Sequence, residues 1–443
     1  MKTFAVLTFL LLSARLAAIE FDSPARIDGR TDKDPLSYEV GEKIVFTLRL
    51  ADLGREIPAG SRIKWRRSGD DGKVESGEVV AGKEPFKVET SLSKCGFVRL
   101  RAELVDGSGK VYPRKGSSHW AMTYGVFFDG SAAARPYEAK QYPEPKDFDS
   151  FWARRKARLE SLPMKIECVE IPTTNGVTKT FAVSVNCAGP RPVTGYMTVP
   201  VDAYTKGVKY PAAVTFAGYA ANFGQPRPPL KAGPKDRIRF SINAHGYELG
   251  REKEYYTEFC NSVKSAGRDY AFDKVQNSNP DQAYFSGMTY RVMRAVAFLK
   301  TLKEWNGRDL SASGASQGGL QAIWAASLCD GVTSLYLDVP WSCDLARSKM
   351  GRHCGRWAIE WTEALGYYDP VNMIKRMPRN CRFTIGRAGL GDYICPPSGL
   401  ALLYKNAAAR EKSICYVQGS THGYVPPEPK QTHVDRKRET KSR

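Results

Sequence analysis

The sequence predicts an α/β fold, a mostly parallel sheet with helices on both faces, preceded by a separate β-sandwich domain. Three observations support this prediction. The chain has 443 residues, more than one compact core usually holds. Alternating strand patterns without helical periodicity fill its first third. Strand and helix patterns then alternate through the remainder, which is typical of a parallel sheet.

Residues 19–135 are predicted to form the β-sandwich. Apolar and polar residues alternate in stretches such as 43–50 and 96–104, and turn sequences such as Asp-Gly separate them. Strands at this spacing favour a sandwich of immunoglobulin-like type. Residues 136–429 are predicted to form the α/β domain, which begins with a helix from Asp147 through Ser161.

The two ends of the chain lie outside these domains. Residues 1–18 combine a positive start, an apolar run at 4–12 and small residues at the end, which predicts a Sec-type signal peptide and a secreted or periplasmic protein. The apolar run is short for a membrane span, although Arg15 near the cleavage site leaves a retained anchor as the alternative. Residues 430–443 are strongly basic and are predicted to be disordered.

The most informative motif is Gly-x-Ser-x-Gly at residues 314–318, with Gly319 behind it. A strand pattern precedes the motif and a helical pattern follows, so Ser316 is expected on a sharp turn that exposes its hydroxyl. Small neighbours permit the strained backbone of such a turn. Ser316 is therefore predicted to be a catalytic nucleophile. A glycine-rich turn with an incidental serine is the alternative.

A serine nucleophile needs a base, which in α/β-hydrolases follows both the serine and an acid along the chain. His422 lies just after the strand pattern of residues 413–417 and is predicted to be this base. His353 comes too soon after the serine, and His433 lies in the basic tail. His422 is therefore the only histidine in the expected place.

Asp392 is predicted to be the acid of the triad. It follows the apolar strand pattern of residues 382–386 and precedes His422, as the order requires. Asp369, before Pro370, competes for this role but is better explained as a helix cap or turn residue.

Two backbone amides are predicted to form the oxyanion hole. One belongs to Gln317, where the N-terminus of the following helix favours developing negative charge. The other belongs to Tyr219, which follows the buried strand pattern of residues 210–216. The Tyr219 ring could also form a wall of the acyl pocket. A strand-terminal turn with a packing tyrosine is the alternative.

These residues resemble the acetyl xylan esterase / cephalosporin-C deacetylase family, carbohydrate esterase family 7, which has the α/β-hydrolase fold. The similarity covers about residues 140–427 and rests on four segments: 216–219, 314–319, 391–397 and 422–424. The resemblance implies Ser316, Asp392 and His422 as the triad, with the Tyr219 and Gln317 amides as the oxyanion hole. It implies a serine esterase that removes acetyl groups from xylan-like oligo- or polysaccharide.

The sequence departs from the family at two places. Ala217 stands where the family usually has a histidine, and the family's Arg-Gly-Gln element is replaced at residues 243–247. The second change lies near the pocket in relatives, so it affects the expected substrate more than the expected chemistry.

The composition narrows the possible partners. The formal net charge is +19, but no recognition motif accompanies it, so nucleic acid is not an expected partner. Attraction to an acidic polysaccharide is the hypothesis that this charge favours. Ten scattered cysteines are compatible with disulfides, and Cys343, His353 and Cys354 match no zinc pattern. No metal and no organic cofactor are expected.

Two other classes of function remain open. A serine peptidase of the prolyl-oligopeptidase type shares the motif and the triad order, although the N-terminal region is too short for a propeller. A non-catalytic glycan-binding relative is the second alternative, because of the β domain and the altered pocket segment.

Overall fold

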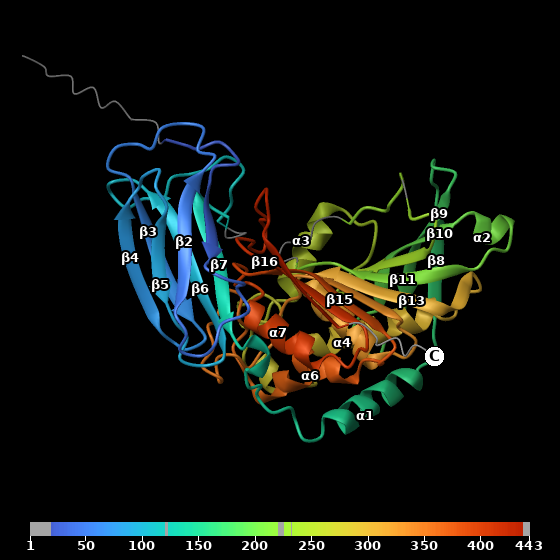
Figure 1. Cartoon of the computed structure of the whole chain (residues 1–443). Coiled ribbons are helices and arrows are strands. Elements are labelled where there is room, and N and C mark those ends of the chain that lie inside the picture. Colours follow the sequence, from blue (N-terminus) through green and yellow to red (C-terminus); the bar gives the residue numbers. More distant parts are fainter. Residues whose placement is uncertain (1–18, 120–122, 220–225, 232, 437–443) are drawn as a thin grey trace, which may run out of the picture.

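The computed structural model describes residues 19–119, 123–219, 226–231 and 233–436 (Figure 1). The predicted signal peptide, residues 1–18, lies outside the described residues. Among the described residues, no helix is both long and apolar enough to cross a bilayer. All ten cysteines are described, and each is a free thiol.

The N-terminal part consists of two small antiparallel sheets, ordered β1-β2-β5 and β4-β3-β6-β7. Because apolar and polar residues alternate along the strands, each sheet has one face that is buried in the core. Phe46 and Leu48 face inward from the first sheet, and Leu100 and Leu104 face them from the second in one shared hydrophobic core. The strands are β1 (Arg26–Thr31), β2 (Ile44–Ala51), β3 (Arg62–Gly69), β4 (Val74–Val80), β5 (Phe86–Thr90), β6 (Gly96–Val105) and β7 (Phe127–Ala134).

The second part is built on a ten-stranded mixed sheet, ordered β17-β16-β15-β14-β13-β11-β12-β10-β9-β8. The six strands from β16 to β12 in this order are parallel, and antiparallel strands flank them on both sides. The strands are β8 (Ile166–Ile171), β9 (Thr178–Val185), β10 (Val193–Pro200), β11 (Tyr210–Phe216), β12 (Ile238–Ile242), β13 (Trp305–Ala315), β14 (Ser334–Asp338), β15 (Arg382–Gly389), β16 (Lys412–Val417) and β17 (Gln431–Arg436).

The helices of this part begin before its first strand and then alternate with strands or groups of strands along the chain. They are η1 (Pro136–Glu138), α1 (Phe148–Glu160), α2 (Asp202–Thr205), α3 (Lys253–Ser262), η2 (Gln276–Ser278), α4 (Tyr284–Leu299), α5 (Gln317–Leu328), η3 (Glu363–Tyr367), α6 (Pro370–Met373), η4 (Ile374–Arg376) and α7 (Pro397–Asn406). Helix α5 is buried along its whole length between β11, β13 and β14 on one side and α4 and α6 on the other.

The prediction of helices on both faces is wrong for the parallel centre of the sheet. Helices α4 to α7 form one connected layer against a single face (Figure 1). On the other face, Ser241 and Tyr336 are exposed and Thr215 and Thr384 are half-buried. Alternation of buried apolar and accessible polar residues along these strands is typical of a sheet covered on one side.

The predicted disorder of residues 430–443 is corrected for the first part of that segment. Residues 431–436 form β17, which pairs antiparallel with β16. The prediction followed from the charge of the segment, but an open sheet edge pairs through its backbone N–H and C=O groups, whatever the side chains are. Residues 437–443 lie outside the described residues.

Candidate active site

Ser316 lies on a sharp turn between β13 and α5. Its backbone has φ 54° and ψ −122°, a strained conformation for a residue with a side chain. The Ser316 N–H donates to the carbonyl of Asp338 (3.0 Å), and the Ser316 carbonyl accepts from the N–H of Trp341 (2.9 Å). The first bond goes to the last residue of the neighbouring strand β14 and the second to the loop that follows this strand, so both hold the turn from one side.

The glycines of the motif permit close backbone contacts around Ser316. A Cβ atom on Gly318 would lie 2.2 Å from the carbonyl oxygen of Phe216, and one on Gly319 would lie 2.8 Å from Pro340. A Cβ on Gly314 would lie 2.3 Å from the backbone of Gly318. These positions exclude any side chain, which explains why the motif is rich in glycine.

Asp392 and His422 are in direct contact at the same end of the sheet. Asp392 follows β15 and is buried, and its Oδ2 lies 2.9 Å from His422 Nδ1. Its other oxygen, Oδ1, accepts hydrogen bonds from the amides of Ile394 (3.0 Å) and Cys395 (2.9 Å). The carboxylate is therefore held by two backbone donors and faces the imidazole with its remaining oxygen.

His422 lies at the tip of a tight turn after β16. The Thr421 N–H donates to the carbonyl of Tyr424 across the turn (2.9 Å). The Arg387 guanidinium, from β15, donates to the carbonyls of Thr421 (3.1 Å) and His422 (3.4 Å). The same guanidinium forms a bidentate ion pair with the Asp338 carboxylate, at 2.9 and 3.1 Å.

The ion pair connects the three predicted triad residues. Asp338 accepts the N–H of Ser316 through its carbonyl and binds Arg387 through its carboxylate, and Arg387 binds the carbonyl of His422. Within the described residues, Ser316 Oγ itself has no hydrogen-bond partner. Hydrogen bonds between a nucleophile and its base are often long in unliganded enzymes and tighten when substrate binds.

Both predicted oxyanion donors belong to segments in backbone contact. Gly318, at the start of α5, packs on the carbonyl of Phe216, and the Gly218 Cβ position is 3.8 Å from the carbonyl of Ala315. The loop after β11, with Tyr219, therefore lies beside the turn that carries Ser316 and Gln317. That these two amides form the oxyanion hole stays a prediction.

The Tyr219 ring is part of an aromatic wall beside this turn. It stacks on Tyr270 with ring centroids 4.3 Å apart, and its edges meet Trp341 (5.6 Å) and Trp357 (5.0 Å). The Tyr270 hydroxyl donates to Oε1 of Gln317 (2.8 Å). This hydrogen bond connects the aromatic wall to Gln317, the first residue of α5.

The divergent segment at residues 243–247 packs against this wall through His245. His245 is buried, its ring packs on Tyr270 at 4.6 Å, and its Nδ1 lies 2.8 Å from the Tyr284 hydroxyl. Burial, and then the nearby Arg291 and Arg191, hold the pKa of His245 well below its usual value. A neutral imidazole therefore supports the wall in this chain.

Asp369, the competing acid, caps helix α6. Its carboxylate accepts the N–H groups of Val371 (3.0 Å), Asp344 (3.1 Å) and Leu345 (2.7 Å). Burial, and then the neighbouring carboxylate of Asp344, raise the pKa of Asp369 to about 7. The interpretation of this residue as a cap is confirmed.

Within the described residues, one group of possible metal ligands converges. The ligand atoms of Asp392, Cys395 and His422 lie within 4.8 Å of one another. Burial, and then the adjacent Asp392 carboxylate, raise the pKa of the Cys395 thiol well above its usual value. Zinc needs the thiolate, so this donor set suits the orientation of a histidine better than metal binding.

Sequence reasoning missed the residues that support the site from other parts of the chain. The sequence does not identify Asp338 and Arg387, because no motif marks an ion pair between the ends of two strands. The same holds for Ser131 of β7, whose backbone exchanges two hydrogen bonds with the Gln418 side chain (3.0 and 2.9 Å). The Ser131 hydroxyl also donates to the carbonyl of Leu390, close to Asp392.

Comparison with known proteins places the chain in a family. The family model for acetyl xylan esterase (AXE1) matches residues 134–353, which include Tyr219 and Ser316. Acetyl esterase Axe7A of Xylanibacter ruminicola is 23% identical over 339 residues, which cover 73% of this chain and 70% of that protein. The N-terminal sheets lie almost entirely outside the family match.

Two solved structures show the same fold. They are the acetyl xylan esterase from Paenibacillus sp. R4 and acetyl xylan esterase 1 from Thermoanaerobacterium sp. JW/SL YS485. Each aligns with a TM-score of 0.52 and 19% identity, over 66% of this chain and 94% of its own. This likeness shows the α/β-hydrolase fold. With the family match, it follows that the chain belongs to the acetyl xylan esterase family and is a carboxylic ester hydrolase.

Proposed function

We propose that this protein removes acetyl groups from acetylated oligo- or polysaccharide through an acyl-enzyme formed on Ser316. The observation that carries the proposal is the contact between Asp392 and His422, joined through Arg387 and Asp338 to the strained turn of Ser316. A buried carboxylate that orients an imidazole, together with a half-buried serine on a strained turn, is the set of groups that serine hydrolases use for acyl transfer.

The first half of the reaction forms the acyl-enzyme. Ser316 Oγ attacks the carbonyl carbon of the acetyl ester while His422 Nε2 takes the hydroxyl proton. Asp392 holds the ring and stabilises its positive charge. The amides of Tyr219 and Gln317 stabilise the oxyanion of the tetrahedral intermediate. The C–O bond to the sugar then breaks, and the imidazolium returns the proton to the departing sugar oxygen.

The second half releases acetate. A water molecule attacks the acetyl-serine carbonyl while His422 takes one of its protons. The tetrahedral intermediate collapses, the bond to Ser316 breaks, and the imidazolium returns a proton to Oγ. Tyr219 and Trp357, the half-buried rings of the aromatic wall, offer apolar surface to the acetyl methyl group and to the sugar ring, and Tyr270 and Trp341 are buried.

The decisive experiment compares Ser316→Ala with Ser313→Ala. Ser313 lies in β13, three residues before the nucleophile, and is a matched control. We expect Ser316→Ala to abolish hydrolysis of 4-nitrophenyl acetate and acetylated xylo-oligosaccharide with an unchanged circular dichroism spectrum, and Ser313→Ala to remain active. Full turnover by a folded Ser316→Ala protein would refute the assignment.

We also propose that the protein is exported and that its two N-terminal sheets form an immunoglobulin-like sandwich. The composition of residues 1–18 supports export. The shared core of the two sheets supports the sandwich. N-terminal sequencing of protein recovered from the periplasm or the medium tests export. A first residue other than one near Ile19 would contradict cleavage there.

A further inference from the structure

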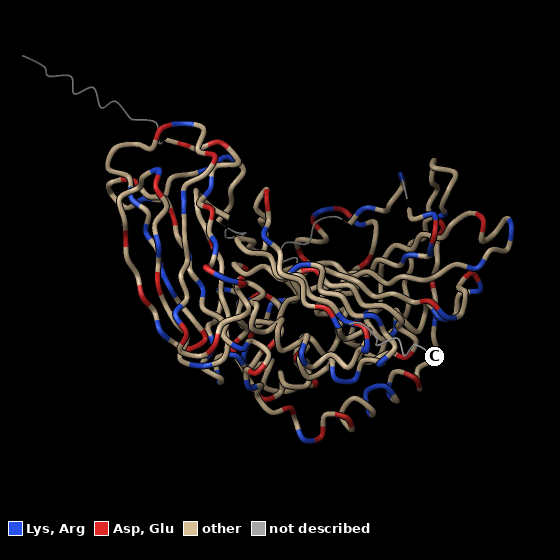
Figure 2. The backbone as a smooth tube through the Cα atoms, in the orientation of Figure 1, with Lys and Arg blue, Asp and Glu red and all other residues tan. Residues whose placement is uncertain are grey.

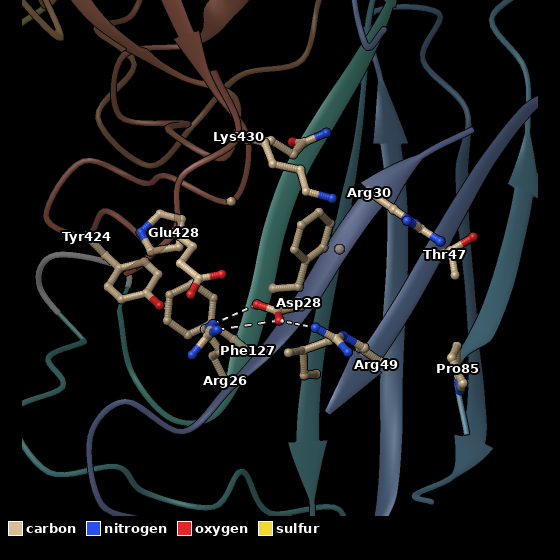
Figure 3. Close-up of a pocket in the computed structure, with 16 residues that line it drawn as sticks. Arg26, Asp28, Arg30, Thr47, Arg49, Pro85, Phe127, Tyr424, Glu428 and Lys430 are labelled. Carbon is tan, nitrogen blue, oxygen red and sulfur yellow. Dashed lines mark hydrogen bonds and ion pairs between the residues drawn. The ribbon is translucent and has the colours of Figure 1, made fainter. Parts of the chain in front are cut away.

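An open groove lies between the N-terminal sheets and the end of the catalytic part. It measures about 360 Å³ and is bordered by β1, β2 and β7 on one side and by residues 418–430 on the other (Figure 3). We call it the interdomain groove. Its charged lining residues are Arg26, Asp28, Arg30, Arg49, Glu428 and Lys430. Its size is within the range of small-ligand sites.

The interdomain groove contains more positive than negative charge. Arg26 and Arg49 both bind the carboxylate of Asp28, at 2.6 and 3.4 Å, as the dashed lines in Figure 3 show, and Arg26 also pairs with Asp52, which does not line the groove. Arg30 and Lys430 are exposed and have no salt bridge to any described residue. Lysine and arginine are otherwise spread over both parts of the chain (Figure 2).

Arg30 and Lys430 come from different domains. Arg30 extends from β1, and Lys430 directly precedes β17. Figure 3 shows both side chains at the same part of the groove. Because neither cation forms a salt bridge with a described residue, an anion bound between them would be stabilised by both.

The interdomain groove is continuous with the turn that carries His422. Tyr424, two residues beyond His422, lines the groove and packs its ring on Phe127 of β7, with centroids 5.3 Å apart. Gln418 and Gly419, at the start of the same loop, line it as well. A polymer bound in the groove therefore lies next to the loop that holds the proposed base.

We propose that the interdomain groove binds a carboxylate-bearing stretch of the saccharide chain whose acetyl ester is cleaved at Ser316. The inference rests on the proposed function, because that function makes the bound polymer a saccharide. The Arg30 guanidinium offers two parallel N–H donors to a carboxylate, and Lys430 adds a point charge. Thr47 and Glu428 line the same groove and offer partners for sugar hydroxyls.

The test measures binding separately from catalysis. The probes are hexagalacturonate and neutral xylohexaose, neither of which carries an ester, titrated into the full-length protein by calorimetry at low salt. We expect wild-type protein to prefer the anionic probe, with an affinity that falls as sodium chloride is added. The double variant R30Q/K430Q should bind hexagalacturonate about tenfold more weakly, as expected for lost charge-assisted hydrogen bonds.

The matched control removes two positive charges elsewhere. Lys73 and Lys110 are exposed loop lysines of the N-terminal part and do not line the groove. We expect K73Q/K110Q to bind like wild type, with the melting temperatures of both variants as a check on folding. Equal weakening in both double variants would show a general charge effect and overturn the proposal, as would equal wild-type affinity for the two probes.

Two further measurements separate this inference from the proposed function. Absence of 4-nitrophenyl acetate hydrolysis by wild-type protein would refute the proposed function, whatever the probes do. Inorganic phosphate and single-stranded DNA are additional titrants. If either bound through Arg30 and Lys430 as tightly as hexagalacturonate, the groove would be a general anion site and the saccharide assignment would be wrong.

Discussion

Arg387 donates to the carbonyl oxygen of His422 and also forms a bidentate ion pair with Asp338. The guanidinium thereby connects the loop after β16 with the end of β14, and Asp338 in turn accepts the N–H of Ser316. The relative position of the proposed nucleophile and base thus depends on one side chain that touches neither reacting atom. Arg387 is a positioning residue.

Replacing Arg387 with glutamine should lower kcat more than it changes KM. The loop with His422 would lose its support, and a displacement of about 1 Å at a reacting group costs on the order of 100-fold in rate. Steady-state kinetics with 4-nitrophenyl acetate measure the effect. Arg382→Gln, at the exposed opposite end of β15, is the control, because its partner Glu411 is 3.5 Å away on the surface. Equal kcat values for both variants would contradict the positioning role.

Replacing Asp392 with asparagine should lower kcat by about four orders of magnitude, because an amide cannot hold the imidazole in the required tautomer. Asp369→Asn is the informative comparison. Asp369 accepts three backbone N–H groups at the cap of α6, so its loss should reduce the unfolding free energy and leave kcat of the remaining folded protein nearly unchanged. Kinetics and chemical denaturation of both variants decide between the two acids, and the reverse pattern would assign the acid role to Asp369.

Replacing Gln418 with alanine should destabilise the protein by about 1–3 kcal/mol, since the N–H and carbonyl of Ser131 would stay buried without partners. Urea denaturation measures this change, with the exposed Gln431→Ala as a control. Because Ser131 also contacts the Asp392 loop, the activity of Gln418→Ala should fall as well. A loss of stability below 0.5 kcal/mol, the ordinary range of surface substitutions, would show that β7 does not support this loop.

Asp70 should make the protein more stable under mildly acidic conditions than at neutral pH. It is buried where β3 meets the catalytic part and accepts the N–H groups of Phe97 (2.9 Å) and His353 (3.1 Å). Burial raises its pKa from 3.8 to about 6, against the lowering effect of these bonds. Between about pH 4 and pH 6 the folded state therefore holds more protons than the unfolded chain, and stability falls as the pH rises through this window.

The size of this effect is about 3 kcal/mol, from a pKa difference of roughly two units. The measurement is the unfolding free energy of wild type minus that of Asp70→Asn, from pH 4 to pH 7.5, which removes the contribution of other groups. Arg352 lowers and Asp344 raises the pKa of Asp70, and both remain in the variant. A difference that is constant with pH would show that Asp70 has an ordinary pKa.

The sequence alone determined the local parts of the proposed site. The Gly-x-Ser-x-Gly motif specified the strained turn of Ser316, because only glycine fits within 2.2 Å of the Phe216 carbonyl at position 318. The order of Ser316, Asp392 and His422 along the chain predicted the triad, and in the structure the last two residues are in contact. These features depend on a few neighbouring residues, and such short-range information is present in the sequence itself.

Only the tertiary structure decided which distant segments support those residues. The pairing of Arg387 with Asp338, the bonds from Ser131 to Gln418, and the charges of Arg30 and Lys430 at one groove all join positions far apart in the chain. The strand at residues 431–436 likewise depends on an open sheet edge and not on its own composition. The identity of a charged or polar residue does not indicate which distant residue it will bind, because that depends on how the folded chain brings the two together.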